Sequence, residues 1–496
     1  PYETLYTNVL NMLELSDIAI HNNERQLDDP IIIAGGHACF NPEPMHAFID
    51  AFVIGDGEEV IHEILDVLSI KKLKNIPRDE IIDSLAIISG VYVPSVHKEK
   101  KHSTHQAHPS SQNSILKCVV NPLPPHITDF LVPNIDVVHN RISIEIMRGC
   151  TRGCRFCQAG MISRPVRERS KSEIISTAKM ALANTGFEDL SLLSLSTSDY
   201  SDISSVLIDL QKEFSNNRQK ISLPSLRIES FSTELMDIFH DERKGNFTLA
   251  PEAATENLRS RINKPITSQS LIDVAKRIYT SGWESIKLYF MIGFPEETDD
   301  DIHSICDLCI QVKDIGKRII GHRAKLNLSI NTFIPKPHTP FQWAPFALRN
   351  EVKKKQQIIR ERLQRSTIKV SMASFDSSLL EALLCRGNRG MAEVIFDAWK
   401  NGARFDSWRD QYNAKIWFDA FMSHGYEPET YLSAGFDVES SLPWDHISTG
   451  VSKEYLIDEF NNSKVMKIRG DCRDGCFSCG IQTAFHISCK DSLHHE

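Results

Sequence analysis

Between residues 142 and 332, short apolar runs alternate with amphipathic helical stretches, and this alternation limits the fold more strictly than any other feature. The runs are "ISIEIM", "DLSLLSLS", "SLPSLRIES", "NFTLA", "SIKLYFMIG" and "KLNLSINTF". Helical stretches such as "KSEIISTAKMALANTG" lie between them and end at glycine, which favours a helix C-terminus. Thr298, with Asp301 three residues later, predicts a capping box at the start of another helix. Strands that alternate with helices usually pair in parallel. We therefore predict an α/β fold with six βα units, forming a barrel or part-barrel over residues 141–345.

Three cysteines follow the first strand, within "IEIMRGCTRGCRFCQAG". The loops after the strands build the active site in barrels of this kind. Cys150, Cys154 and Cys157 are one thiol too many for a redox dithiol and one ligand short of a closed zinc site. Three thiolates instead fit an iron–sulfur cluster with one iron open to another ligand.

The spacing Cys-x-x-x-Cys-x-x-Cys, with Phe156 before the last thiol, resembles that of the radical S-adenosylmethionine (SAM) superfamily. The resemblance implies a (β/α)6 partial TIM barrel and a 4Fe-4S cluster held by the three cysteines, whose free iron binds SAM. It also implies reductive cleavage of SAM to methionine and a 5′-deoxyadenosyl radical that abstracts hydrogen from a substrate. A one-electron reductant such as flavodoxin or ferredoxin would be a partner. Arg148, Arg152 and Arg155 would place positive charge near the cluster.

Other residues at the barrel end are candidate SAM contacts under this resemblance, with ordinary polar packing as the alternative for each. After the second strand, where the family often has Gly-Gly-Glu, this chain has "LSLSTSDY". The sequence "RIES" ends the third strand, and "YFMIGFPEET" places a glycine turn after the fifth, where the backbone can pass close to adenine. The candidate contacts are Phe156, Ser196, Ser198, Glu229, Glu252, Gly293 and Pro295.

The first 90 residues predict a partial Rossmann-like domain. The runs "PIIIAGG" and "DAFVIGDGEE" predict two buried parallel strands, and they resemble the later half of the cobalamin-binding domain in one branch of the superfamily. An open α/β sheet usually has about four strands or more, so we expect part of this domain to precede Pro1 and cobalamin to bind this chain poorly. The Asp-x-His-x-x-Gly motif of an axial histidine is absent. Residues 91–140, with "HKEKKHSTHQAHPSSQNS", predict a linker or flexible insertion.

A second group of cysteines lies in the C-terminal region, residues 346–496, which we expect to be mostly helical. Cys472, Cys476 and Cys479 repeat the spacing of the first group, and His486 or Cys489 could supply a fourth ligand. We interpret this group as an auxiliary 4Fe-4S cluster, with structural zinc as the alternative. Cys306 and Cys309, on the apolar side of a helical stretch, predict core packing instead of a redox pair.

Composition excludes several classes of protein. No apolar run approaches the roughly 20 residues that span a bilayer, and clustered cysteines indicate a reducing cytoplasm. The formal net charge of −9 gives no general reason to expect nucleic acid. The basic tract 349–369 predicts a solvated helix face, with an RNA-binding helix as the alternative.

The leading interpretation is a radical SAM enzyme that modifies an unactivated carbon, with methyl transfer through cobalamin as one form of the reaction. The substrate cannot be named from the sequence, and RNA is one candidate. Sulfur insertion of the methylthiotransferase type, with the C-terminal cluster as sulfur donor, is an alternative. An iron–sulfur electron carrier is another, but it would need neither six βα units nor an open coordination site.

Overall fold

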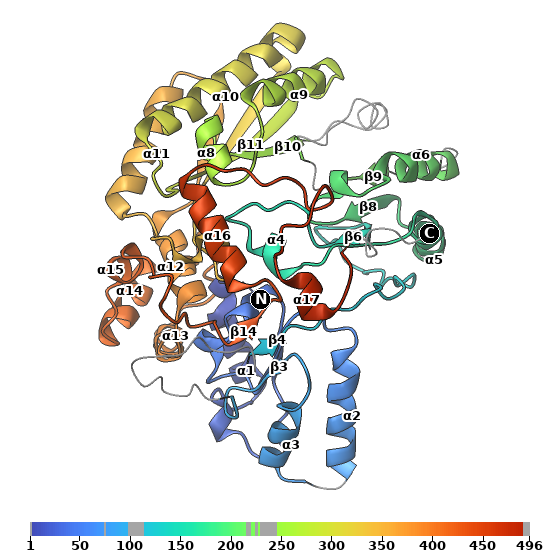
Figure 1. Cartoon of the computed structure of the whole chain (residues 1–496), viewed down its shortest axis with the longest axis vertical. Coiled ribbons are helices and arrows are strands. Elements are labelled where there is room, and N and C mark those ends of the chain that lie inside the picture. Colours follow the sequence, from blue (N-terminus) through green and yellow to red (C-terminus); the bar gives the residue numbers. More distant parts are fainter. Residues whose placement is uncertain are drawn as a thin grey trace.

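The computed structural model describes residues 2–73, 76–97, 114–214, 220–223, 227–228 and 246–489 (Figure 1). Two parallel sheets form the predicted part-barrel. The first has the order β5 (Ile142–Glu145), β8 (Asp189–Leu193), β9 (Lys220–Ser222), and the second has the order β10 (Asn246–Glu252), β11 (Ser285–Ile292), β12 (Lys325–Thr332), β13 (Lys369–Met372). Every strand pair within these two sheets is parallel. The α/β part-barrel predicted from the periodicity is confirmed.

Two details differ from the expected six strands in one sheet. Within the described residues, no strand pair joins β9 to β10, and β9 ends at Ser222, near the start of the expected run "SLPSLRIES". A seventh strand, β13, pairs with β12 beyond residue 345, so the second sheet extends into the region expected to be mostly helical. This strand has four residues at the sheet edge, none of them buried, and such an edge strand carries little hydrophobic signal.

Five long helices connect or follow these strands: α5 (Lys171–Thr185), α6 (Ile203–Phe214), α9 (Ser268–Thr280), α10 (Asp299–Ile320) and α11 (Arg349–Leu363). They lie on the outside of the part-barrel (Figure 1). The predicted capping box starts α10, because Thr298 and Asp301 satisfy each other's backbone N–H groups. The predicted glycine ends α5, where Gly186 adopts the left-handed conformation. Cys306 and Cys309 are fully buried, which confirms that they pack in the core.

The N-terminal part contains a three-stranded sheet in the order β1 (Ile33–Gly35), β2 (Ala51–Val53), β3 (Val91–Tyr92). The two predicted strands pair in parallel, and β3 adds an antiparallel strand that was not predicted. The helices of this part are α1 (Tyr6–Leu15), α2 (Val60–Leu73) and α3 (Arg78–Leu85). Residues 98–113, most of the predicted insertion, lie outside the described residues.

The C-terminal region is mostly helical, as predicted. Its helices are α12 (Phe375–Arg386), α13 (Met391–Lys400), α14 (Ala414–Ser423), α15 (Pro428–Ser433), α16 (Lys453–Lys464) and α17 (Ile481–Phe485). Helix α13 packs against α1, and α16 packs against α8 (Glu256–Arg261) beside the second sheet. The short strand β14 (Ile447–Ser448) pairs with β4 (Ile115–Leu116). In the part of the chain that the structure describes, every helix is too short or too polar to cross a bilayer.

Candidate active site

The loop with the first three cysteines is closed at its base by a small antiparallel pair, β6 (Met147–Arg148) with β7 (Arg167–Glu168). Gly149 opens the loop at φ +93°, and a Cβ there would lie 2.7 Å from the carbonyl oxygen of Pro165. Helix α4 (Gln158–Ile162) closes the loop, and the Sγ of Cys157 caps its N-terminus by accepting the Gly160 N–H at 3.3 Å. The backbone therefore fixes the position of the last thiol before any metal binds.

All three thiols line one cavity of about 360 Å³ at the carboxyl ends of the strands. The remaining lining residues come from the same loop, from the end of β8, and from β10 and β11 with their connections. These are Arg152, Phe156, Gly160, Leu195, Arg227, Thr248, Ala250, Glu252, Lys264 and Tyr289. The predicted metal ligands and the predicted contacts Phe156 and Glu252 thus share one cavity.

The donor set fits an iron–sulfur cluster. Burial raises the pKa of the Cys157 thiol to about 12 and also raises the pKa of Cys150, so the thiolates need positive charge such as iron. In the described parts of the chain, no three His, Cys, Asp or Glu side chains are arranged to hold a single metal ion. A cubane cluster does not require that arrangement, because each thiolate binds a different iron. Cys150, Cys154 and Cys157 would be these ligands.

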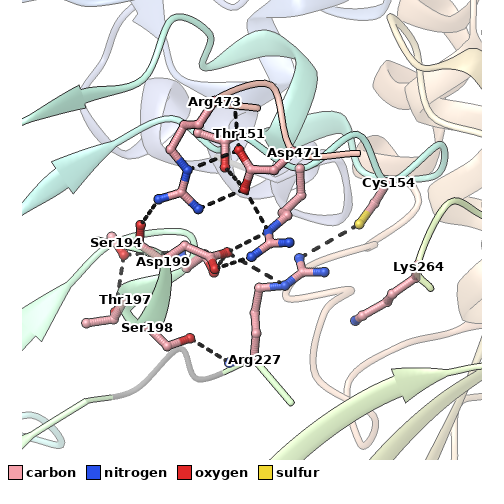
Figure 2. Close-up of polar contacts among 12 residues, drawn as sticks. Thr151, Cys154, Ser194, Thr197, Ser198, Asp199, Arg227, Lys264, Asp471 and Arg473 are labelled. Carbon is pink, nitrogen blue, oxygen red and sulfur yellow. Dashed lines mark hydrogen bonds and ion pairs between the residues drawn. The ribbon is translucent and has the colours of Figure 1, made fainter. Parts of the chain in front are cut away.

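An ion pair between Glu252 and Lys264 lies on the β10 side of the cavity. Glu252, the last residue of β10, has φ +66°, and its carboxylate accepts a hydrogen bond from Lys264 Nζ at 3.1 Å. Arg227 adds a second cation, with Nη1 3.9 Å from the Sγ of Cys154 (Figure 2). Phe156 packs against Phe294 with ring centroids 6.3 Å apart. The cavity thus combines thiols, both signs of charge and an aromatic surface.

Asp199 organises the arginines of the site (Figure 2). It is 5% exposed, and its carboxylate lies 2.6 Å from Arg152 Nη2 and 3.7 Å from Arg227 Nε. Ser196 donates its hydroxyl to the same carboxylate at 2.6 Å. Burial alone would raise the pKa of Asp199, but the hydrogen bonds from Arg152 and Ser196 outweigh it and hold the pKa below its usual value.

The C-terminal segment joins this network through Asp471 (Figure 2). The Asp471 carboxylate accepts the Thr151 hydroxyl at 2.8 Å and lies 3.2 Å from Arg152 Nε. Arg473 pairs with Asp471 at 2.8 Å and donates to the backbone oxygen of Asp199 at 2.7 Å. The backbone N–H of Cys472 donates to the Thr151 oxygen at 3.2 Å. Residues 471–473 therefore contact the first cysteine loop directly.

Of the three loop arginines expected near the cluster, Arg152 alone lines the cavity. Arg148 lies 3.0 Å from Asp56 and 2.7 Å from Glu58, at the carboxyl end of β2. Arg155 is fully buried, pairs with Glu459 of α16 at 3.0 Å and donates to three backbone oxygens. Arg148 and Arg155 thus fasten the loop to the N-terminal and C-terminal parts of the chain.

The other predicted contacts that the structure describes do not line this cavity. The Ser196 hydroxyl is engaged by Asp199, and the Ser198 hydroxyl accepts the backbone N–H of Arg227 at 2.9 Å. Gly293 and Pro295 follow β11 but are not among the described residues that line the cavity. Gly293 has φ +89° and donates its N–H to the Glu297 carboxylate at 2.6 Å. Glu229 lies outside the described residues.

The sequence interpretation missed three charged residues of the site, Asp199, Lys264 and Asp471. Asp199 follows the serines of "LSLSTSDY", a segment already singled out, and Lys264 lies 12 residues after the candidate contact Glu252. Asp471 precedes the second cysteine group, but its partner Thr151 is 320 residues away. No local pattern identifies a contact over that distance.

The second cysteine group contains four thiols. The thiol of Cys472 interacts electrostatically with Cys479 and Cys489, and that of Cys489 interacts with Cys476. Cys489 is half-buried and is the candidate for the fourth thiol, and His486 is exposed. None of the twelve cysteines forms a disulfide.

Two family models match the chain. The model of the N-terminal part of radical SAM proteins matches residues 1–94, and that of the radical SAM superfamily matches residues 144–309. The uncharacterized protein MJ0966 of Methanocaldococcus jannaschii is 30% identical over 400 residues, which cover 79% of this chain and 78% of that protein. The N-terminal match shows that a segment similar to residues 1–94 is also found in other radical SAM proteins.

Partial similarities extend to enzymes with named reactions. The ribosomal protein uS12 methylthiotransferase of Clostridioides difficile is 26% identical over 182 residues, covering 34% of this chain and 40% of that enzyme. A tRNA-2-methylthio-N(6)-dimethylallyladenosine synthase of Pelotomaculum thermopropionicum is 25% identical over 184 residues, which cover 35% of this chain and 40% of that enzyme. The chain thus spans about 40% of the length of these two enzymes.

Among solved structures, the radical SAM methyltransferase TsrM of Kitasatospora setae, with cobalamin and a 4Fe-4S cluster bound, has a TM-score of 0.43 and 14% identity. The match covers 64% of this chain and 59% of that one. Radical SAM enzymes use a 4Fe-4S cluster and SAM, and the cysteine loop, the part-barrel and the family matches all agree. This chain belongs to the radical SAM superfamily and is an enzyme.

Proposed function

We propose that the chain binds a 4Fe-4S cluster through Cys150, Cys154 and Cys157, binds SAM in the adjoining cavity, and modifies an unactivated carbon of its substrate. The observation that carries this proposal is the shared cavity, in which three thiols, Glu252, Lys264 and Arg227 lie together at the carboxyl ends of parallel strands. When bound, the cluster supplies the electron that splits SAM into methionine and a 5′-deoxyadenosyl radical.

The cavity offers complementary groups for SAM. The Lys264 ammonium and the Arg227 guanidinium suit the carboxylate of the methionyl part, and the Glu252 carboxylate suits its amino group. Phe156, beside Phe294, supplies an apolar surface at the thiols. Ser196 and Ser198 support the arginines through Asp199 and the Arg227 backbone, so we assign them a positioning role.

Two narrower reactions each have one supporting observation. Methyl transfer through cobalamin is favoured by the N-terminal sheet, because the carboxyl end of β2 contacts Arg148 of the cysteine loop, and α/β sheets bind ligands at that edge. Sulfur insertion is favoured by the second thiol group beside the first loop.

RNA and ribosomal protein are candidate substrates because the partially similar methylthiotransferases act on them. A flavodoxin or ferredoxin in a reducing cytoplasm would supply the electron.

Removing one cluster ligand tests the main proposal. We expect Cys154→Ala to abolish 5′-deoxyadenosine formation and to lose about four irons per chain, because three thiolates are needed to hold the cubane. Both quantities are measured on anaerobically purified, reduced protein. The matched control is Cys306→Ala, which removes a buried thiol of α10 away from the loop. SAM cleavage by the Cys154 variant at the parent rate would refute the ligand assignment.

Titration with cobalamin, followed by visible absorbance, tests the methyl-transfer form. We expect weak binding of cobalamin by this chain, because its described N-terminal sheet has three strands, fewer than most open α/β sheets. Tight binding of one cobalamin per chain would show that β1, β2 and β3 suffice.

A further inference from the structure

We propose that Cys472, Cys476, Cys479 and Cys489 bind a second 4Fe-4S cluster, closed by four protein thiolates, that relays the reducing electron to the first cluster. This inference rests on the proposed function, because a relay needs a first cluster to reduce. It assigns the second cysteine group a role in electron transfer and not in sulfur donation.

The backbone between these cysteines bends to bring the four thiols together. Ser478 has φ +53° and His486 has φ +52°, a conformation that side chains other than glycine adopt at a cost. Gly480, at φ +100°, has no room for a side chain, since a Cβ would lie 2.8 Å from the Gly450 oxygen. The Gln482 side chain contacts both Cys476 and Cys489. A chain constrained in this way indicates a site and not a flexible tail.

Two buried basic side chains interact with the thiols and lack a carboxylate partner. Arg164 is 6% exposed, interacts electrostatically with Cys472 and Cys479, and packs its guanidinium over the Tyr455 ring at 5.5 Å. Lys117 is 3% exposed, donates to the backbone oxygens of Ile162 and Arg164, and interacts electrostatically with Cys479, while burial lowers its pKa to about 7. Among the described residues, neither cation forms an ion pair with a carboxylate within 4.0 Å.

Such burial calls for a nearby anion. Removing a cation from water costs several kcal/mol unless a negative charge compensates it. A 4Fe-4S cluster with four thiolates carries net negative charge, so it would supply the missing partner for Arg164 and Lys117. The second site is therefore built around an anion that the protein's own carboxylates do not provide.

The spacing of the thiols favours a cluster over zinc. Cys472, Cys476 and Cys479 repeat the Cys-x-x-x-Cys-x-x-Cys spacing of Cys150, Cys154 and Cys157, the loop that lies within the superfamily match. Cys489 adds a fourth thiol, so four thiolates would hold the four irons of a cubane, with one thiolate on each iron.

The position of the second group gives the electron a path. Cys476 is exposed, so a protein donor can approach this edge of the site. On the inner side, the Cys472 N–H···O=C hydrogen bond reaches Thr151, which is joined covalently to Cys150. One hydrogen bond therefore separates the two groups of ligands.

The electron balance of the relay is simple. An external one-electron donor is oxidised by one electron, the second cluster takes up this electron and passes it on, and SAM at the first cluster is reduced. The second cluster ends each cycle in its starting oxidation state. Four thiolates leave no iron open to an added sulfide, which favours the relay over the role of sulfur donor.

Iron counting tests the second cluster. We expect about eight irons per parent chain, and about four after Cys476→Ala or Cys489→Ala, with zinc absent from each. Cys476 is exposed, so its loss does not threaten the fold, and Cys306→Ala is the matched control with about eight irons. Electron paramagnetic resonance of the reduced proteins should show the loss of one of two signals. Four irons plus one zinc in the parent, or unchanged iron in both variants, would overturn the proposal.

Two reductants test the relay. With a flavodoxin or ferredoxin system, we expect Cys476→Ala to form 5′-deoxyadenosine roughly tenfold more slowly than the parent. With a small-molecule reductant that reaches the first cluster directly, we expect a rate within about twofold of the parent. Equal losses with both reductants, or no loss with either, would refute the relay. If the parent itself cleaves no SAM, the proposed function fails, while the iron counts still test the second site.

Discussion

Gly149 illustrates how individual residues shape the cysteine loop. Its φ of +93° lies in the region that side chains avoid, and two carbonyl oxygens, of Pro165 and Ser163, lie 2.7 and 2.9 Å from where a Cβ would be placed. Because Cys150 follows directly, any shift of the backbone here moves a cluster ligand. Gly186, at the end of α5, also has positive φ but has nothing within 4 Å of its Cβ position.

The two glycines form a matched pair for mutation. In both alanine variants the free energy of unfolding falls by about 1–2 kcal/mol, because the left-handed backbone conformation is strained for alanine. We expect Gly149→Ala in addition to lose most of its cluster iron, since the loop must move to admit the methyl group, whereas Gly186→Ala should keep the iron of the parent. Iron content and thermal unfolding of the two variants measure the difference. Equal iron in both would show that the loop tolerates the shift.

Glu43 is a buried carboxylate outside the active site. It is 1% exposed and contacts Tyr92, Arg389 and His446 at 2.6, 2.5 and 3.1 Å. Burial would raise the pKa of Glu43, but the nearby His446, the hydrogen bond from Tyr92 and the Arg389 charge outweigh it and lower the pKa to about 2. The ionised form therefore stabilises the fold.

The pH dependence of stability tests this role of Glu43. A pKa lowered from 4.5 to about 2 corresponds to roughly 3 kcal/mol. This stabilisation is fully present above the unfolded value, near pH 4.5, and is lost as the pH falls toward 2. We expect the difference in unfolding free energy between the parent and Glu43→Gln to shrink over that range, measured by urea unfolding of metal-free protein. A difference independent of pH would contradict the assignment.

At the scale of elements, helix α16 links the C-terminal region to the cysteine loop. Its Glu459 is fully buried and accepts hydrogen bonds from Arg155 of the loop at 3.0 Å and from Arg469 at 2.6 Å. The neighbouring Asp458 is largely exposed and pairs with Arg469 at the surface. Two adjacent carboxylates thus pair with arginines, Glu459 in the protein interior and Asp458 at the surface.

Substitution of these two residues separates a buried ion pair from an exposed one. We expect Glu459→Gln to lower the free energy of unfolding by about 3 kcal/mol or more, because Arg155 is left buried without a compensating charge. Asp458→Asn should change it by less than about 1 kcal/mol. Thermal unfolding midpoints of both variants provide the comparison. Similar midpoints for the two would mean that α16 contributes little to holding the loop.

The elements predicted correctly are those whose signals are local. The Thr298–Asp301 capping box and the Gly186 helix end depend on residues within one helical turn, and the cysteine spacing depends on eight residues. Strand β3 has only two residues, and β13 alternates polar and apolar residues without burying any of them, so neither has such a signal. The acceptors and ion partners of the site, above all Asp471, depend on tertiary contacts that a single sequence does not encode locally. Cavity-facing residues were therefore predicted only where a motif marked them.

At the scale of the whole molecule, the N-terminal part is joined to the barrel by Asp56. The Asp56 carboxylate pairs with Arg167, a side chain that is 1% exposed. The same carboxylate lies 3.0 Å from Arg148 and accepts the Val120 N–H at 3.0 Å. Burial would raise the pKa of Asp56, but Arg167 outweighs it and the pKa is lowered. This contact holds β2 against the base of the cysteine loop.

Loss of this charge should loosen the contact between the N-terminal part and the barrel. We expect Asp56→Asn to lower the free energy of unfolding by about 3 kcal/mol, since Arg167 stays buried without its partner. Calorimetry should show the N-terminal part unfolding at a lower temperature than the barrel. Glu284→Gln, which removes an exposed pair with Arg323, is the control and should change stability by less than about 1 kcal/mol. A single unshifted transition in Asp56→Asn would contradict this.

The contact between Thr151 and Asp471 spans 320 residues, and this separation sets a time scale for synthesis in the cell. A ribosome that adds about 5–20 residues per second needs roughly 15–65 s to travel from one to the other. During that interval the loop of Cys150, Cys154 and Cys157 has left the ribosome, but Asp471, Arg473 and Glu459 do not yet exist. The nascent loop therefore lacks these contacts until residue 473 has been synthesised, so it reaches its folded geometry for iron and sulfide only after that point.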